Sequence, residues 1–255
     1  MTDLYTKVNY IQEIPILSGD IYEYDISKAN ISVLYTRGLI DRNKYNYLYN
    51  EDSQVRKVIV GNMQRDNPNL TKELQQGIIE AKKTLFESNG LKDEEVLSIK
   101  NDAVFTIRPL DITSFQSIVF KLKNHYNLFM KIYKLEFYYN DTGQLDIKGI
   151  QDDVLYIQKD HFVLFLKELF SVYRTRGVDD ALRLLQRFYF LYNRKELDPE
   201  YYRDLRTGKY LLYTDSMYRY ESDVFEISLL PYIGTYDNNA ILRGIARILY
   251  SECLK

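Results

Sequence analysis

The sequence predicts an α+β protein with an antiparallel sheet, a helical insertion and a helical carboxyl-terminal part. Three observations predict this class. Residues 96–105 and 135–150 each read as two short apolar strands joined by a polar turn, which is typical of antiparallel hairpins. Residues 39–89 have helical spacing and lie between an earlier strand at 21–26 and the first hairpin. Beyond residue 156 the apolar residues return to helical spacing.

The first expected strand covers residues 21–26 and places a carboxylate, Asp25, near its end. Ser27 is positioned to cap a helix that runs to Arg37, and Gly38 is positioned to end that helix. We expect this strand-to-helix turn to expose Asp25. An aspartate before a helix is also an ordinary helix terminus, so Asp25 alone does not establish a site.

A helical insertion follows the first strand. Residues 39–65 have a helical pattern with many polar side chains, and Asp66-Asn67-Pro68-Asn69 interrupts it. A second helix is expected from a cap at Thr71 to Asn89-Gly90. Its apolar residues at helical spacing are Leu74, Ile78, Ala81 and Leu85.

The hairpin at 96–105 carries a second carboxylate, Asp102, at its polar tip. Aspartate is also an ordinary turn residue, so this position alone is not specific either. The second hairpin pairs 135–139 with 144–150 across a turn at Asn140-Asp141-Thr142-Gly143.

Two apolar stripes predict helices in the carboxyl-terminal part, with side chains in the core rather than against a cofactor. They are Phe162, Phe165, Leu166, Leu169 and Tyr173, and Ala181, Leu182, Leu185 and Phe188. From Gly208 onward the pattern indicates little except a final helix from Asn239 to Leu254. We interpret Thr214-Asp215-Ser216 as an ordinary turn.

Composition limits the class of protein. The chain has 255 residues, 45% of them hydrophobic, enough for one compact unit or two small subdomains. Its single Cys253 permits no internal disulfide, and two histidines, His125 and His161, make a zinc enzyme a poor expectation. A run of about 18 apolar residues and a secretion leader are both missing, so we expect a cytoplasmic protein without a membrane partner.

The net charge and the local distribution of charge make different predictions about nucleic-acid binding. The net charge of −2 argues against binding by bulk electrostatics. Basic residues nevertheless cluster locally, which is compatible either with a basic groove or with solvated helix faces. The clusters are Lys121, Lys123, Lys131, Lys134 and Lys148, and Arg174, Arg176, Arg183, Arg187, Arg194 and Lys195. The 25 tyrosines and 12 phenylalanines could stack on bases, although most aromatic side chains serve as core.

Two carboxylates presented by separate strands suit a magnesium site. Magnesium prefers oxygen ligands and keeps waters and substrate phosphates in its shell, so one or two carboxylates are enough. Asp25 and Asp102 are therefore candidate ligands of a pair of ions about 4 Å apart, the arrangement used in nucleotidyl transfer.

The order of these features resembles the family B DNA polymerases in a much shortened form. The segment from Asp25 to Leu34 resembles that family's first catalytic motif, with Asn30 and Ile31 where it has a Tyr-Pro pair. The segment from Lys100 to Phe105 resembles the Asp-Thr-Asp-Ser hairpin, of which only the second aspartate remains, as Asp102.

The resemblance continues downstream. The segment 123–126 is similar to a Lys-x-Tyr element that contacts the primer, and 146–150 to the Lys-Gly-Ile segment that follows it. Residues 184–202 are similar in rhythm to the helical thumb. The resemblance implies four parts: palm at 1–38, fingers-like insertion at 39–92, palm again at 93–155 and thumb-like helices at 156–255.

The resemblance also implies roles for individual residues. Asp25 and Asp102 would be catalytic and would hold Mg²⁺, with Mn²⁺ as a substitute. Nucleotide binding would fall to Asn30, Arg56, Lys57 and Arg65. Contacts to the primer-template would come from Lys100, Lys123, Tyr126 and Lys148. Lys100 stands near the expected ions and could weaken metal binding, and no exonuclease segment precedes the first motif.

We therefore expect a minimal nucleic-acid polymerase, a nucleotidyltransferase that extends a primer with nucleoside triphosphates, of phage or mobile-element type. It would act in the host cytoplasm, and so small a chain makes a replication partner protein plausible. Because Asn30 replaces the bulkier Tyr, we expect weak discrimination against ribonucleotides. Two alternatives stay open: an inactive palm that binds nucleic acid or a replication partner, and an interaction protein that binds no nucleic acid.

Overall fold

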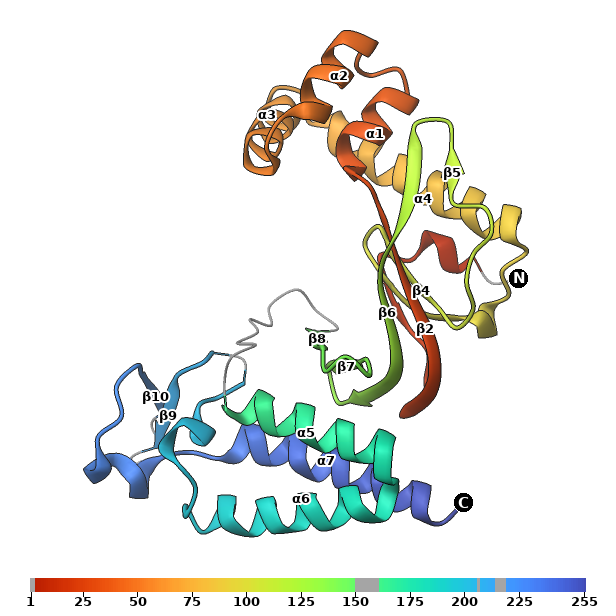
Figure 1. Ribbon diagram of the computed structural model, residues 1–255. Coiled ribbons are helices and arrows are strands. Elements are labelled where there is room, and N and C mark those ends of the chain that lie inside the picture. The colour runs from red at the N-terminus through yellow and green to blue at the C-terminus, as the bar shows by residue number, and fades with distance from the viewer. Residues whose placement is uncertain (1–2, 150–160, 206, 214–218) are drawn as a thin grey trace. The chain divides into compact units, whose positions relative to one another are not determined.

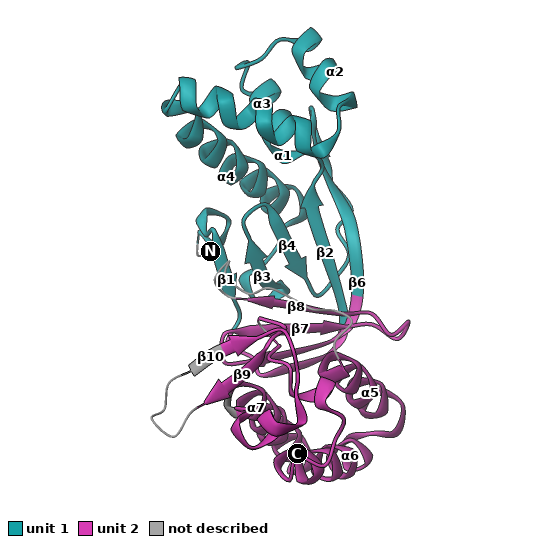
Figure 2. Ribbon diagram, turned by 90° about the vertical axis from the view of Figure 1, so that its left-hand side faces the viewer, with its two compact units in different colours: residues 1–12, 20–125 teal, residues 13–19, 126–255 magenta. Residues whose placement is uncertain are grey.

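The computed structural model describes residues 3–149, 161–205, 207–213 and 219–255 (Figure 1). The chain divides into two compact units (Figure 2). Unit 1 contains residues 1–12 and 20–125, and unit 2 contains residues 13–19 and 126–255. Two long strands, β2 (Ile16–Ile26) and β6 (Ile118–Ile132), contribute residues to both units.

Unit 1 contains an antiparallel sheet with strand order β1-β3-β4-β2-β6, and β5 pairs with β6. The remaining strands are β1 (Asn9–Ile11), β3 (Val96–Lys100), β4 (Ala103–Thr106) and β5 (Ser114–Phe115). The hairpin expected at 96–105 is confirmed, with Asn101 and Asp102 at its tip. The expected strand at 21–26 is confirmed as the second half of β2. The predicted α+β class with an antiparallel sheet is therefore confirmed.

Helices pack beside this sheet. They are α1 (Ala29–Thr36), α2 (Arg42–Asn50), α3 (Ser53–Asp66), α4 (Asn69–Asn89) and the short 3₁₀ turns η1 (Leu4–Thr6) and η2 (Asp93–Glu95). Helix α1 packs against α2 and α4, and α3 packs against α4. Val33, Leu34, Leu48 and Leu85 are fully buried within this cluster.

The insertion between β2 and β3 holds more helices than the two that were predicted. The single helix expected at 39–65 is wrong, because α2 ends at Asn50 and Asp52 starts α3 by accepting a hydrogen bond from the Gln54 N–H at 2.7 Å. The cap expected at Thr71 is also wrong. Helix α4 begins two residues earlier, at Asn69, whose N–H donates to the Asn67 side chain.

Helix α1 begins and ends differently from a standard capped helix. Ser27 is not its cap, because the Ser27 N–H donates to the Val119 carbonyl at 2.8 Å and so belongs to the sheet. Lys28 makes the turn instead, in the left-handed conformation (φ 53°). The predicted stop at Gly38 is confirmed: it has φ 68°, and the next N–H reaches back to the Leu34 carbonyl.

Unit 2 combines the end of β6 with a hairpin and three helices. Its other elements are β7 (Leu135–Tyr139), β8 (Leu145–Gly149), α5 (His161–Arg176), α6 (Val178–Asn193), η3 (Pro199–Tyr202), β9 (Tyr210–Tyr213), β10 (Arg219–Ser222), η4 (Ile227–Tyr232) and α7 (Tyr236–Cys253). Strand β7 pairs with β6 and β8, which confirms the second predicted hairpin. Helix α6 packs against α5 and α7.

The two predicted apolar stripes of unit 2 are confirmed as core. All their members are buried except Tyr173, which is partly buried at the edge. The final helix is confirmed, although it starts at Tyr236 rather than Asn239. The pair of strands β9 and β10 was not predicted. Ile150 and the turn at 214–216 lie outside the described residues.

Candidate active site

The structure brings Asp25 and Asp102 together in unit 1. Asp25 lies in β2 directly opposite Ala103, the first residue of β4, so the neighbouring hairpin tip places Asp102 beside it. Asn101 supports the tip because it adopts φ 53°, a left-handed conformation that asparagine tolerates. The two carboxylates that the sequence paired are therefore close in the structure, although they are 77 positions apart in numbering (102 minus 25).

The two carboxyl groups interact directly. The pKa of Asp102 is raised to about 7, first by burial, then by the negative charge of Asp25 and by a hydrogen bond between the two side chains. A neighbouring negative charge makes the charged form of Asp102 less favourable, and a nearby cation opposes this effect. Near neutral pH the pair can therefore hold a proton, or exchange it for a positively charged ligand.

Lys123 provides one such positive charge. It lies on β6, and its Nζ atom is 3.2 Å from Asp25 Oδ2 and 3.8 Å from Glu23 Oε1. Burial acts to lower the pKa of Lys123, but Glu23, Asp25 and Asp102 together raise it. The side chain is 54% exposed, so its flexible stem is able to move away from the acids.

Buried Glu23 and half-buried Asn124 lie beside the pair. Glu23 is only 1% exposed, and its carboxylate accepts a hydrogen bond of 2.7 Å from the Asn124 side chain. Glu23 and Asp25 are two residues apart in one strand and so lie on the same face of the sheet. Sequence reasoning missed Glu23, although this two-residue spacing was a signal that could have identified it.

Lys82 holds the hairpin tip from the other side. It projects from α4, is 1% exposed, and donates hydrogen bonds to the carbonyls of Lys7 (2.6 Å) and Asn101 (3.1 Å). Burial lowers its pKa to about 8, while the charge of Asp102 opposes that shift. The neighbouring Asn101 N–H donates to the Val8 carbonyl at 2.7 Å. Helical spacing, four residues after Ile78 and three before Leu85, places Lys82 beside the apolar stripe and was a signal that distinguished it from Lys83.

The residues present fit magnesium as a pair of ligands rather than as a closed cage. Across the described ranges of the chain, no cluster of three or more His, Cys, Asp or Glu side chains is arranged to hold a metal. Magnesium, however, needs few protein ligands. A divalent cation would also relieve the repulsion between Asp25 and Asp102 that, together with burial, raises the Asp102 pKa. Asp25 and Asp102 are the residues that would hold the ion.

The predicted nucleotide-binding residues lie on helices of the same unit. Asn30 is exposed in the first turn of α1, five positions after Asp25. Arg56, Lys57 and Arg65 all belong to α3. Their described contacts are local ones: Arg56 donates to the Glu51 carbonyl, and Arg65 donates to the Asn62 side chain at 3.2 Å.

The predicted nucleic-acid contacts are divided between the units. Lys100 ends β3 next to the Asp102 tip, and Lys123 lies on the carboxylate pair itself. Tyr126 needs correction: it is fully buried in unit 2 and donates its hydroxyl to Asp146, so in this structure it has no surface with which to hold a backbone. Lys148 also belongs to unit 2, with its Nζ atom 5.6 Å from the centre of the Tyr138 ring.

Comparison with known proteins places the chain in a family. Residues 1–249 match the family model described as Bacteriophage PBS1 gene 130 protein, and the chain therefore belongs to that family. No curated protein matches the chain. Among the described helices, none has the length and apolar character that crossing a membrane requires.

Proposed function

We propose that this member of the Bacteriophage PBS1 gene 130 protein family is a nucleotidyltransferase that extends a nucleic-acid primer. Unit 1 would supply a polymerase-like palm with the fingers-like insertion at 39–92, and residues 156–255 would serve as a thumb. One observation carries the proposal: Asp25 of β2 and Asp102, in the turn that precedes the neighbouring strand β4, share a hydrogen bond between their carboxyl groups.

The chain's own residues would act mainly by charge and position, as phosphoryl transfer requires. Asp25 and Asp102 would hold magnesium, which when bound polarises phosphoryl oxygens and activates an attacking hydroxyl. Lys123 would leave the acids when the cation enters, and its ammonium would then be available to a phosphate. Arg56, Lys57 and Arg65 would neutralise the triphosphate.

Asn30 would contact the sugar of the incoming nucleotide. Its amide is shorter than a tyrosine ring and can hydrogen-bond to a 2′-hydroxyl instead of excluding it. We therefore propose weak discrimination between deoxy- and ribonucleotides. Lys100 and Lys148 would contact the primer-template backbone, and the reaction would take place in the cytoplasm of the host cell.

Primer extension tests the proposal. A labelled primer-template is incubated with Mg²⁺ or Mn²⁺ and with deoxy- or ribonucleotides supplied separately. Product is expected from the wild type and from the control Asp111→Asn, whose carboxylate lies in an exposed loop. Product should be lost in Asp25→Asn and in Asp102→Asn. Extension that survives in either of these two variants would contradict the assigned role of the pair.

An inactive palm that binds nucleic acid is the second candidate, and a specific observation favours it. Lys123 already neutralises Asp25 at 3.2 Å, and Lys100 stands where the resemblance places a further aspartate. Such a protein would retain the duplex without forming product under either metal. Wild-type protein that binds the primer-template but never extends it would therefore select this candidate over the enzyme.

A further inference from the structure

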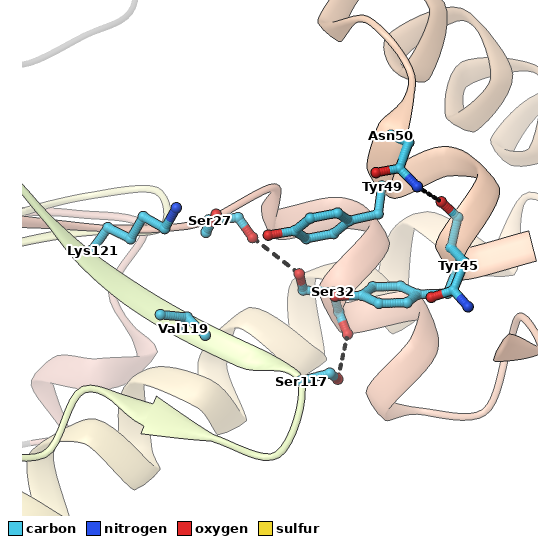
Figure 3. A pocket seen from close by; sticks show the side chains of 9 residues that line it. Ser27, Ser32, Tyr45, Tyr49, Asn50, Ser117, Val119 and Lys121 are labelled. Carbon is cyan, nitrogen blue, oxygen red and sulfur yellow. Dashed lines mark hydrogen bonds between the residues drawn. The ribbon is translucent and has the colours of Figure 1, made fainter.

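We propose that a pocket next to the carboxylate pair binds a single nucleotide unit, with its base against two tyrosines of α2 and its phosphate toward Lys121. The pocket measures about 260 Å³ and lies within unit 1 (Figure 3). Its lining residues are Ser27, Ser32, Tyr45, Asn46, Tyr49, Asn50, Ser117, Val119 and Lys121. The choice of a nucleotide over other phosphorylated ligands rests on the proposed function.

One wall of the pocket is aromatic and held in place. The Tyr45 ring stacks on Tyr35 with centroids 4.5 Å apart, and Tyr49 lies 5.6 Å from Tyr45. Lys28 fixes Tyr49 further, because its Nζ atom is 3.5 Å from the ring centre and donates to the Tyr49 carbonyl. Figure 3 shows both rings pointing from α2 toward the serines. A rigid aromatic wall suits a planar ring.

The opposite wall is polar. Ser32 donates to the Ser27 carbonyl at 3.0 Å, and Ser117 shares a hydrogen bond with the Thr36 hydroxyl. On the α2 side, Asn46 and Asn50 add amide donors and acceptors, and the Asn50 side chain also donates to the Asn46 carbonyl at 3.0 Å. A base edge and a sugar hydroxyl require such mixed donors and acceptors.

Charge selects an anionic ligand. Among the lining residues there is no carboxylate, whereas Lys121 is exposed at the pocket rim. The volume lies just below the range of about 300–1,000 Å³ that is typical for drug-sized ligands. The pocket therefore suits one nucleotide unit and is too small for several.

The position of the pocket connects it to the carboxylate pair. Ser27 follows Asp25 by two residues, and Lys121 precedes Lys123 by two residues on β6. A strand rises about 3.3 Å per residue, so each step of two residues spans about 7 Å. The Ser27 N–H bond to Val119 keeps the two segments paired. A nucleotide in the pocket would thus direct its phosphate along the strand that carries Lys123.

Fluorescence of 2-aminopurine tests this proposal, because the base is quenched when it stacks on an aromatic ring. The Asp102→Asn protein is titrated in EDTA, so that neither metal nor chemistry is involved. One arm uses 2-aminopurine deoxyribonucleoside triphosphate, and the other uses a single-stranded oligonucleotide with one 2-aminopurine. Saturable quenching in the first arm identifies a free nucleotide as the ligand, and quenching in the second identifies an unpaired nucleotide of a strand.

Variants separate the pocket from other binding surfaces. We expect Tyr49→Leu to weaken binding about tenfold because the base loses an aromatic surface on which to stack. Lys121→Met should also weaken binding, because the phosphate loses its charged partner. Tyr47→Leu and Lys44→Met are matched controls on α2, are exposed, and should not change binding. Asn46→Ala provides a further test at an exposed position if Tyr49→Leu fails to fold.

Absence of quenching in both arms would overturn the proposal. Equal affinity of Tyr49→Leu and Tyr47→Leu would overturn it as well, because binding would then lie elsewhere. Primer extension does not enter this experiment. A protein that never extends a primer, yet shows quenching that depends on Tyr49, would defeat the proposed enzyme activity while leaving the pocket assignment intact.

Discussion

Folding makes the charged form of the Asp102 carboxylate less favourable. Its pKa rises from 3.8 to about 7 in the folded chain, because of burial and then because of Asp25. Between these two pH values the folded protein retains a proton that the unfolded chain has lost. The free energy of unfolding should therefore fall as pH rises through this interval and level off above it.

Urea denaturation in EDTA at about pH 5 and about pH 8 measures this effect. We expect the wild type to lose stability at the higher pH and Asp102→Asn to lose much less. Asp111→Asn, which changes an exposed carboxylate, should behave as the wild type. A full pH effect that persists in Asp102→Asn would assign the titration to another group.

A second prediction concerns the hydrogen bonds that the buried Lys82 side chain donates. Lys82→Met keeps the buried stem but leaves the Lys7 and Asn101 carbonyls without their donor, which should cost about 1–3 kcal/mol in the free energy of unfolding. Lys83→Met is the matched control, since Lys83 is 50% exposed and pairs only weakly with Glu87 at 3.8 Å. Equal denaturation midpoints for the two variants would refute the role assigned to Lys82.

Single residues also show where sequence reasoning stops. Asp25 and Asp102 could be paired from sequence because Asp25 lies near the end of a predicted strand and Asp102 at the tip of a predicted hairpin. Lys82 and Glu23 were missed, because their spacing shows only which face of an element they share, and the burial of their charges becomes apparent only when distant segments pack around them. Tyr126 was misjudged for the same reason, because the sequence alone does not show whether an aromatic side chain is buried in a core or exposed on a surface.

At the scale of elements, two glycines in helices make a matched pair. A Cβ atom on Gly77 of α4 would lie 2.2 Å from Val33 Cγ1, and Val33 is fully buried in α1. A Cβ atom on Gly61 of α3 would meet nothing within 4 Å. The same substitution should therefore have opposite effects at the two positions.

We expect Gly77→Ala to destabilise the protein, because overpacking costs about 1–3 kcal/mol and exceeds or cancels the gain of about 1 kcal/mol in helix propensity. Gly61→Ala should stabilise it by about 0.5–1 kcal/mol. Denaturation midpoints compare the two directly. Stabilisation by both substitutions would show that α1 and α4 are not closely packed in solution.

Helix ends explain which element boundaries could be predicted. Gly38 and Gly90 end α1 and α4 with positive φ, and glycine is the residue expected there. The start of α1 could not be predicted, because Ser27 pairs with Val119 in the sheet before it can cap a helix. Tertiary pairing with a segment some ninety residues away, between positions 27 and 119, overrides the local preference.

At the scale of the whole molecule, the net charge of −2 and the proposed nucleic-acid contacts make opposite predictions about salt. If Lys100, Lys123 and Lys148 contact phosphates, the slope of log affinity against log salt should be about −2.7. Raising salt from about 50 to about 200 mM would then weaken duplex binding by about 40-fold. Fluorescence polarisation of a labelled duplex measures this slope. A slope near zero would favour an interaction protein that does not grip phosphates.

The sequence predicted the kinds of elements in both units better than their boundaries within the chain. Hairpins and apolar helices follow from local periodicity, and these are confirmed at 96–105, 135–149 and in α5 and α6. The division into units does not follow from periodicity, because residues 13–19 group with residues 126–255. Such a grouping depends on contacts between remote segments, which one sequence does not display.

The shared strands have a consequence for the order of synthesis. The Pro15 carbonyl accepts a hydrogen bond from the Lys131 N–H at 2.9 Å, and both residues belong to unit 2. A ribosome adding about 5–20 residues per second needs roughly 6–23 seconds to travel from one to the other. The segment around Pro15 is therefore synthesised that long before the strand that supplies its hydrogen-bond donor.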